Sequence, residues 1–151
     1  MNAETRDKVE HFVSDAISKG AKLEVGGIRP NVPGFFYPPT VLSNVPDNAD
    51  CLSDEIFGPV AAIQSFTDEK EVIERSNSTE YGLVAYLYTE DVRRGLNLSE
   101  KLEFGMIGLN RGLVSDPAAP FGGVKQSGLG REGGKEGMLE FQETQYISTE
   151  W

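Results

Sequence analysis

Residues 105–134 read GMIGLNRGLVSDPAAPFGGVKQSGLGREGG, and ten of the chain's seventeen glycines fall between Gly105 and Gly137. Glycine costs backbone entropy, so it gathers where a chain must turn sharply or approach another surface closely. A flexible linker would contain more serine and less Phe, Leu and Val. The stretch is therefore interpreted as a site-forming loop, and it carries several side chains suited to binding: Asn110, Arg111, Ser115, Phe121, Lys125 and Arg131.

Composition limits the classes of protein to which the chain can belong. Its 151 residues include 14 basic and 24 acidic side chains, for a net charge of −10. Such a surface repels phosphate backbones and anionic lipid, so we expect neither nucleic acid nor a membrane as a partner. No run reaches the roughly 18 apolar residues needed to cross a bilayer. The first residues lack the features of a secretory signal, so a cytoplasmic location is expected.

Hydrophobic periodicity predicts an α/β fold. Apolar residues at three-and-four spacing indicate a helix over 4–18, with Val9, Phe12, Val13, Ala16 and Ile17 on its inner face. Further helices are expected at 68–77, 91–103 and 132–141, and strands at 22–25, 60–66, 83–88, 106–109 and 145–149. Strands that alternate with helices predict a largely parallel sheet, whose ligands lie beyond the carboxyl ends of the strands. The loop at 110–115 follows a strand in this way.

The single cysteine and the single histidine are the first candidates for catalysis. Together they exclude a disulfide framework and a His/Cys zinc cluster built from this chain alone. Cys51 has Asp50 and Asp54 as neighbours, and carboxylates disfavour a thiolate, so a structural role is favoured over a nucleophilic one. His11 falls opposite the apolar face of its helix, which indicates a surface residue without an evident orienting partner.

The segment Glu55-Ile-Phe57-Gly-Pro59 admits two interpretations. Pro59 restricts Gly58 to an extended geometry, so that Glu55 and Phe57 can project from a rigid turn. A carboxylate can accept two hydroxyl hydrogen bonds from a ribose, and an aromatic ring can cover one face of a nicotinamide. The alternative is a turn that buries its phenylalanine. Spacing alone does not separate the two.

These motifs, taken in order, resemble the aldehyde dehydrogenase superfamily. The resemblance covers essentially the whole chain and corresponds to the C-terminal part of the family's catalytic domain. Residues 112–117 are most similar to the succinate-semialdehyde dehydrogenases. The segments that carry the resemblance are Glu55–Pro59, Tyr81–Leu83, Asn110–Gly112 and Pro120–Gly133.

The resemblance implies roles for particular residues. Glu55 would hold the nicotinamide ribose of NAD or NADP, and Phe57 would lie against the nicotinamide. Ser115 would help to bind the distal carboxylate of the substrate, and Phe121 would close the substrate tunnel. Residues 1–142 would be part of the catalytic domain, and 143–151 a strand for homo-oligomerisation. We add Arg111 as a carboxylate ligand, because a guanidinium suits a carboxylate bidentately, with a solvent-facing or acid-paired Arg111 as the alternative.

The resemblance also implies what the chain lacks. The family's cysteine nucleophile, glutamate base, oxyanion-binding asparagine and Rossmann-type cofactor domain all lie N-terminal to the region represented here. The chain is therefore expected to be a fragment of an NAD(P)-dependent enzyme that oxidises a small semialdehyde, in the first place succinate semialdehyde to succinate. No catalytic residue is assigned within it, and alone it is expected to be inactive. The alternatives are a non-catalytic oligomerisation module and, less favoured, a free-standing cofactor binder.

Overall fold

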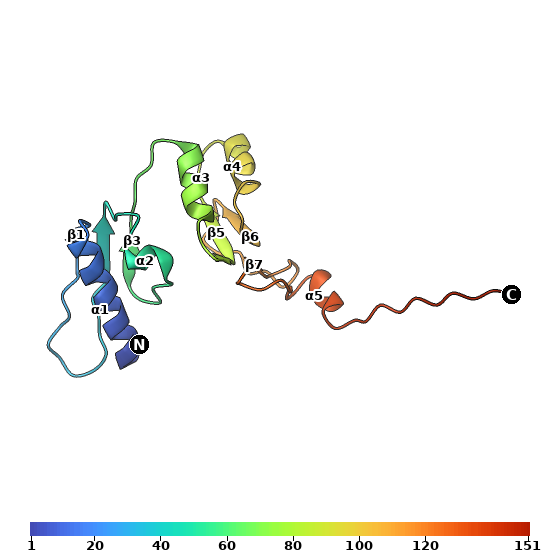
Figure 1. Ribbon diagram of the computed structural model, residues 1–151, viewed down its shortest axis with the longest axis horizontal. Coiled ribbons are helices and arrows are strands. Elements are labelled where there is room, and N and C mark those ends of the chain that lie inside the picture. Colours follow the sequence, from blue (N-terminus) through green and yellow to red (C-terminus); the bar gives the residue numbers. More distant parts are fainter. The chain divides into compact units, whose positions relative to one another are not determined.

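The computed structural model describes residues 1–151, which form two compact units (Figure 1). The first unit spans Met1–Thr67 and the second Asp68–Trp151. Each unit combines helices with short strands, so the predicted α/β class is confirmed. The sequence boundary between the units falls immediately before the Asp68 side chain, which caps the first helix of the second unit.

The first unit places one long helix beside a three-stranded sheet. Helix α1 begins after Asn2, whose side chain accepts a hydrogen bond from the Thr5 backbone N–H at 2.8 Å, as is typical of an N-cap. Strand β2 lies in the centre of the sheet, antiparallel to β1 and parallel to β3. The elements of this unit are α1 (Ala3–Ser18), β1 (Lys22–Val25), β2 (Thr40–Ser43), α2 (Asp50–Ser53) and β3 (Val60–Ala62).

The core of the first unit lies between α1 and the sheet. Burial of each large apolar side chain there is worth about 1.5–3 kcal/mol before entropy is counted. Four of the five predicted inward residues of α1 are buried, whereas Ile17 is 40% exposed at the last turn of the helix. The residues that form this core are Val9, Phe12, Val13, Ala16, Ala21, Tyr37, Leu42, Val45, Ala49 and Cys51.

The second unit contains two small sheets. Strands β5 and β6 pair in parallel, from Val84 opposite Met106 to Leu87 opposite Leu109, and β4 pairs antiparallel with β7. The side chain of Asp68 caps α3 through the N–H of Lys70, and that of Asp91 caps α4 through the N–H of Arg94. The elements of this unit are α3 (Glu69–Asn77), β4 (Tyr81–Gly82), β5 (Val84–Leu87), α4 (Val92–Ser99), β6 (Met106–Leu109), β7 (Val124–Lys125) and α5 (Glu136–Leu139).

A close backbone approach holds the glycine-rich segment against the start of β6. A Cβ atom on Gly105 would lie 2.1 Å from the carbonyl oxygen of Gly122. A Cβ atom on Gly122 would in turn lie 2.3 Å from the carbonyl oxygen of Gly130. Backbone atoms cannot move aside as a flexible side chain can, so both positions require glycine.

Several predicted elements differ from those observed. The pairing is divided among three short sheets, with two parallel and two antiparallel strand pairs, instead of one largely parallel sheet. Strand β5 is partly exposed, although a doubly buried strand was expected, because only β6 pairs with it in this chain. Strand β3 ends at Ala62 rather than at Phe66, α4 ends at Ser99 rather than at Glu103, and α5 is a single turn.

The C-terminal residues 142–151 have no strand partner within the chain. All of their side chains are exposed, and no strand is assigned over 145–149, where one was expected (Figure 1). A strand is defined by its ladder of hydrogen bonds, so an extended segment without a neighbour is not assigned as one. The role of residues 143–151 in subunit pairing is therefore still a prediction.

Two further features of the chain bear on its chemistry. None of its helices combines the length and the apolar character that a transmembrane helix requires. No three or more His, Cys, Asp or Glu side chains lie together in an arrangement suited to a metal ion.

Candidate functional site

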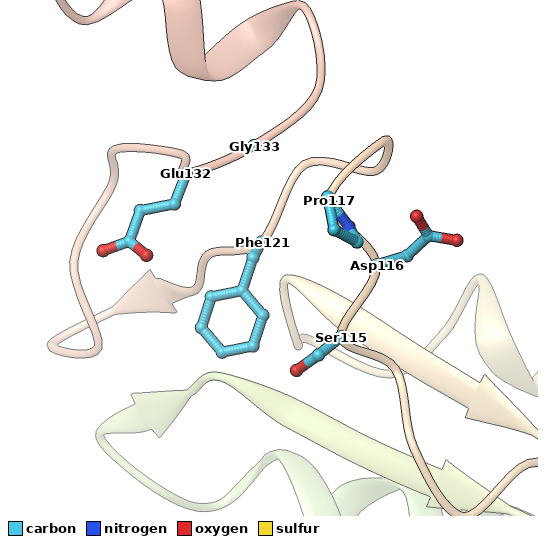
Figure 2. A pocket seen from close by; sticks show the side chains of 6 residues that line it. All are labelled: Ser115, Asp116, Pro117, Phe121, Glu132 and Gly133. Carbon is cyan, nitrogen blue, oxygen red and sulfur yellow. The ribbon is translucent and has the colours of Figure 1, made fainter.

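A pocket of about 340 Å³ lies within the glycine-rich segment of the second unit (Figure 2). The predicted site residues Ser115 and Phe121 both line it, so the structure brings together two side chains that were singled out separately. Figure 2 shows the Phe121 ring extending toward Ser115, whereas the Asp116 carboxylate points away from that ring. The lining residues are Ser115, Asp116, Pro117, Phe121, Glu132 and Gly133.

Asn110 directs the chain from the sheet into this loop. It follows the last residue of β6 and adopts a left-handed conformation with φ of 53°, which asparagine tolerates better than most residues. Its side chain accepts a hydrogen bond from the Thr89 N–H at 2.9 Å and donates one to the Thr89 carbonyl at 2.8 Å. These bonds join the segments that follow β5 and β6, so the loop starts from a fixed point at the carboxyl ends of the two strands.

Backbone hydrogen bonds fix the two sides of the pocket. Phe121 and Glu132 exchange two N–H···O=C bonds of 2.7 Å each, and Gly134 donates to the carbonyl of Pro117 at 3.0 Å. The Asp116 side chain accepts a bond from the Ala118 N–H at 2.9 Å, which closes a local turn. The pocket is thus held by main-chain pairing and by the Asp116 turn, and the side chains of Ser115 and Phe121 are left available to a ligand.

Arg131 holds the adjoining loop in place. Its Nη1 atom donates to the carbonyl oxygens of Gly123, Leu129 and Gly130 at 2.7–3.1 Å. A charged donor that satisfies several carbonyls stabilises a loop more strongly than neutral hydrogen bonds do. Arg131 therefore fixes the segment that lies between the two pocket residues Phe121 and Glu132.

The pocket offers a hydroxyl group, an aromatic ring and two carboxylates. The Ser115 side chain has no hydrogen-bond partner within the chain, so its hydroxyl is available to a ligand. Phe121 is partly buried and supplies an apolar surface. Arg111 is exposed, has no ion pair and does not line the pocket. Its proposed contact with a carboxylate thus depends on its place in the sequence and stays a prediction.

Pocket residues that the sequence analysis missed are Asp116, Pro117, Glu132 and Gly133. Glu132 reaches the pocket because its backbone pairs with that of Phe121, eleven residues earlier. No periodic pattern connects two residues of an irregular loop at that distance. The one available signal was the Asp116-Pro117 dipeptide, which favours a turn next to Ser115.

In the first unit, the Glu55–Pro59 segment presents an exposed aromatic ring. Phe57 is 74% exposed and has φ of 46°, so the alternative of a buried phenylalanine is wrong. A left-handed conformation is unfavourable for a bulky side chain and tends to occur at ligand sites. The segment is seated on α1: a Cβ atom on Gly58 would lie 2.3 Å from Cγ2 of Val9, and Lys8 Nζ donates to the Glu55 carbonyl at 2.8 Å.

Cys51 is a buried side chain of the first unit's core. Its exposed fraction is 6%, and this burial raises the pKa of its thiol. The carboxylates of Asp15 and Asp50 raise the pKa further, although the backbone and Lys19 act in the opposite direction. The thiolate is disfavoured, which agrees with the structural role that the sequence predicts.

His11 has an orienting partner that the sequence did not reveal. Its Nε2 atom lies 3.2 Å from Oδ2 of Asp50. Lys19 donates to the other oxygen of the same carboxylate at 2.8 Å, so the Asp50 carboxylate contacts both His11 and Lys19. The His11 side chain is 63% exposed and lines none of the pockets described here, which agrees with a surface role.

The profile of the aldehyde dehydrogenase family matches residues 1–147, and the chain belongs to this family. It is similar to a succinate-semialdehyde dehydrogenase of Paenarthrobacter nicotinovorans, with 53% identity over 97% of this chain and 33% of that protein. It is also similar to a glutarate-semialdehyde dehydrogenase of Pseudomonas aeruginosa, with 48% identity over 97% of this chain and 30% of the relative.

Solved structures agree with this assignment. One is an aldehyde dehydrogenase of Mycobacterium tuberculosis in complex with NAD+, which matches with a TM-score of 0.85 and 39% identity. The match covers 93% of this chain and 29% of that structure. The chain thus spans about a third of the length of the relatives that it matches. The predicted family is confirmed, and the roles of individual residues stay predictions.

Proposed function

We propose that the chain supplies the substrate-binding wall of an NAD(P)-dependent semialdehyde dehydrogenase. The observation that carries the proposal is the pocket in which Ser115 and Phe121 meet, within the segment that follows strand β6. The family match includes both residues.

The substrate class follows from the pocket together with the relatives. Succinate and glutarate semialdehyde, after which two relatives are named, each combine an aldehyde with a distal carboxylate. The Ser115 hydroxyl would donate a hydrogen bond to that carboxylate, while the Phe121 ring would flank the carbon chain. Asp116 and Glu132 also line the pocket and would repel an anion, so we assign a balancing cation to Arg111, which lies outside the lining but only four residues before Ser115 in the sequence.

In the reaction, aldehyde, NAD(P)+ and water give the carboxylate, NAD(P)H and two protons. Hydride leaves the carbonyl carbon, and water supplies the new oxygen atom. For the cofactor we assign Glu55 to the nicotinamide ribose and Phe57 to the nicotinamide face. The exposed ring and left-handed backbone of Phe57 support this assignment, and the NAD+ complex of the Mycobacterium tuberculosis structure supports a nicotinamide cofactor.

We further propose that these 151 residues alone do not turn over. A cysteine attacks a carbonyl carbon as the thiolate, and the single thiol of this chain, Cys51, is buried, with a raised pKa. The test is aldehyde-dependent NAD(P)H formation with the purified chain, and we expect none above the enzyme-free blank. Turnover that Cys51→Ala abolishes would overturn this part of the proposal.

The binding roles are tested in a chimera. Residues 1–147 of this chain replace the matching segment of the Paenarthrobacter nicotinovorans relative, and oxidation of succinate semialdehyde is followed. Ser115→Ala and Arg111→Ala are expected to raise the KM for succinate semialdehyde at least about fivefold, which corresponds to the loss of one hydrogen bond. Butanal, which lacks the distal carboxylate, is the matched control, and its KM should not change. Equal effects on both aldehydes would contradict the assignment.

A second candidate function is subunit pairing through the C-terminal segment. Residues 142–151 are exposed throughout, with Tyr146 86% and Ile147 71% accessible, and the backbone of 143–151 has no partner in the chain. An unpaired extended segment with apolar side chains is suited to strand addition on a second copy. Size-exclusion chromatography with light scattering tests this. A dimer that dissociates when residues 143–151 are deleted supports pairing, and a monomer at all concentrations contradicts it.

A further inference from the structure

A second cavity, of about 250 Å³, lies beside helix α4 in the second unit, away from the residues assigned above. It is bounded by the first residue of α3 and by one face of α4 and the turn that follows. Arg93 and Asn97 are four residues apart on α4, as are Arg94 and Leu98, so each pair projects from one face. The lining residues are Glu69, Asp91, Arg93, Arg94, Asn97, Leu98 and Lys101.

Both carboxylates in this cavity are already engaged. Glu69 forms an ion pair with Nε of Arg94. Asp91 caps α4, and its Oδ1 accepts a hydrogen bond from the Arg94 N–H at 3.0 Å. The charge of Glu69 is thus paired with a cation of the protein, and one oxygen of Asp91 is occupied by the helix cap.

The remaining polar side chains are donors without a partner. The side chains of Arg93 and Lys101 form no ion pair and no hydrogen bond within the chain, and neither does the amide of Asn97. Arg93 provides five N–H donors in a planar fork, and Lys101 provides three more. The chain has a net charge of −10, yet this lining combines three cationic side chains with two carboxylates, one of which, Glu69, is already ion-paired.

We propose that this cavity binds a compact oxyanion of the phosphate class. Its unpaired donors Arg93, Asn97 and Lys101 follow one another at four-residue spacing along α4 and the turn beyond it, so several of them can reach one small anion. Leu98 is the one apolar side chain in the lining, which leaves little to hold the carbon chain of a dicarboxylate. The volume is also below the range of pockets for drug-sized ligands, which begins at about 300 Å³.

The experiment is calorimetric titration of the 151-residue chain with sodium phosphate and, separately, with sodium pyrophosphate. Ionic strength is held constant with sodium chloride, since exposed charges are screened by salt. Sodium succinate serves as the dicarboxylate probe. The test variant is the double substitution Arg93→Gln and Lys101→Gln. The control Lys135→Gln removes a positive charge from an exposed residue outside the cavity.

We expect pyrophosphate to bind more tightly than phosphate, and both to bind more tightly than succinate. The double variant should lose at least about tenfold in affinity, with an unchanged circular dichroism spectrum, whereas Lys135→Gln should bind as the wild type does. Absence of binding to the wild type would overturn the proposal, as would equal affinity in the double variant. Succinate binding as tightly as pyrophosphate would overturn the phosphate class. The proposal does not depend on the substrate pocket, so failure of either leaves the other intact.

Discussion

Replacing Gly58 with alanine is expected to weaken the contact between the Glu55–Pro59 segment and helix α1. A Cβ atom on residue 58 would lie 2.3 Å from Cγ2 of Val9, which is fully buried. The backbone of Gly58 is not left-handed, so the cost comes from this collision alone. Overpacking of this kind costs about 1–3 kcal/mol.

The same geometry predicts that a second substitution reverses the effect. The Cβ atom on residue 58 would lie 3.5 Å from the Cβ of Val9, which is ordinary van der Waals contact. Val9→Ala alone removes two buried methyl groups and should cost roughly 2 kcal/mol. In that background Gly58→Ala fills part of the vacated space, so it should be neutral or stabilising.

The assay is amide hydrogen exchange of helix α1, measured by nuclear magnetic resonance, because it reports the local opening free energy. Gly58→Ala should reduce protection by roughly 5- to 150-fold, the equivalent of 1–3 kcal/mol. The double variant should be as well protected as Val9→Ala, or better. A double variant that loses the sum of the two single losses of protection would refute the claim that Val9 contacts and positions this segment. Unchanged protection in Gly58→Ala would refute it as well.

Three other predictions follow from features of the first unit. Phe57→Gly should leave the free energy of unfolding unchanged or raise it by about 1 kcal/mol, because glycine tolerates the left-handed backbone, yet it should raise the KM for NAD+ in the chimera. Hydrogen bonds from Lys19 and then His11 lower the pKa of Asp50 below its usual 3.8. The stability that these bonds provide is therefore complete above pH 3.8 and is lost as the pH falls through the lowered pKa of Asp50. Acid unfolding monitored by circular dichroism should show this loss of stability, and the loss should be smaller in Lys19→Met. Cys51 should react with iodoacetamide far more slowly in the native chain than in urea, and comparable rates in the two conditions would contradict its burial and raised pKa.

The parts of the fold that local chemistry determines were predictable from the sequence. Helix α1 follows from apolar spacing, and α3 and α4 begin directly after Asp68 and Asp91, a residue type that is favoured at the N-cap position. The ends of elements were less predictable, because strand length depends on pairing. Strand β3 stops where its pairing with β2 stops, and residues 145–149 have no neighbour at all.

The candidate site was predictable in part, through the family motifs rather than through periodicity. Ser115 and Phe121 were identified in this way, and the structure places them in one pocket. The contribution of Glu132 depends on a backbone bridge within an irregular loop, and the His11–Asp50 contact joins residues 39 positions apart. Both are products of tertiary folding, which local sequence patterns do not encode.

The close approach of Gly105 to Gly122 also limits how this protein can evolve. A single nucleotide change in a glycine codon that alters the amino acid introduces a side chain or a stop codon. At residue 105 that side chain would begin 2.1 Å from a main-chain oxygen, and at residue 122 it would begin 2.3 Å from another. Amino-acid substitutions should therefore accumulate more slowly at these two glycines than at Gly112, where a Cβ atom would meet only Oη of Tyr88 at 3.7 Å, an ordinary van der Waals contact.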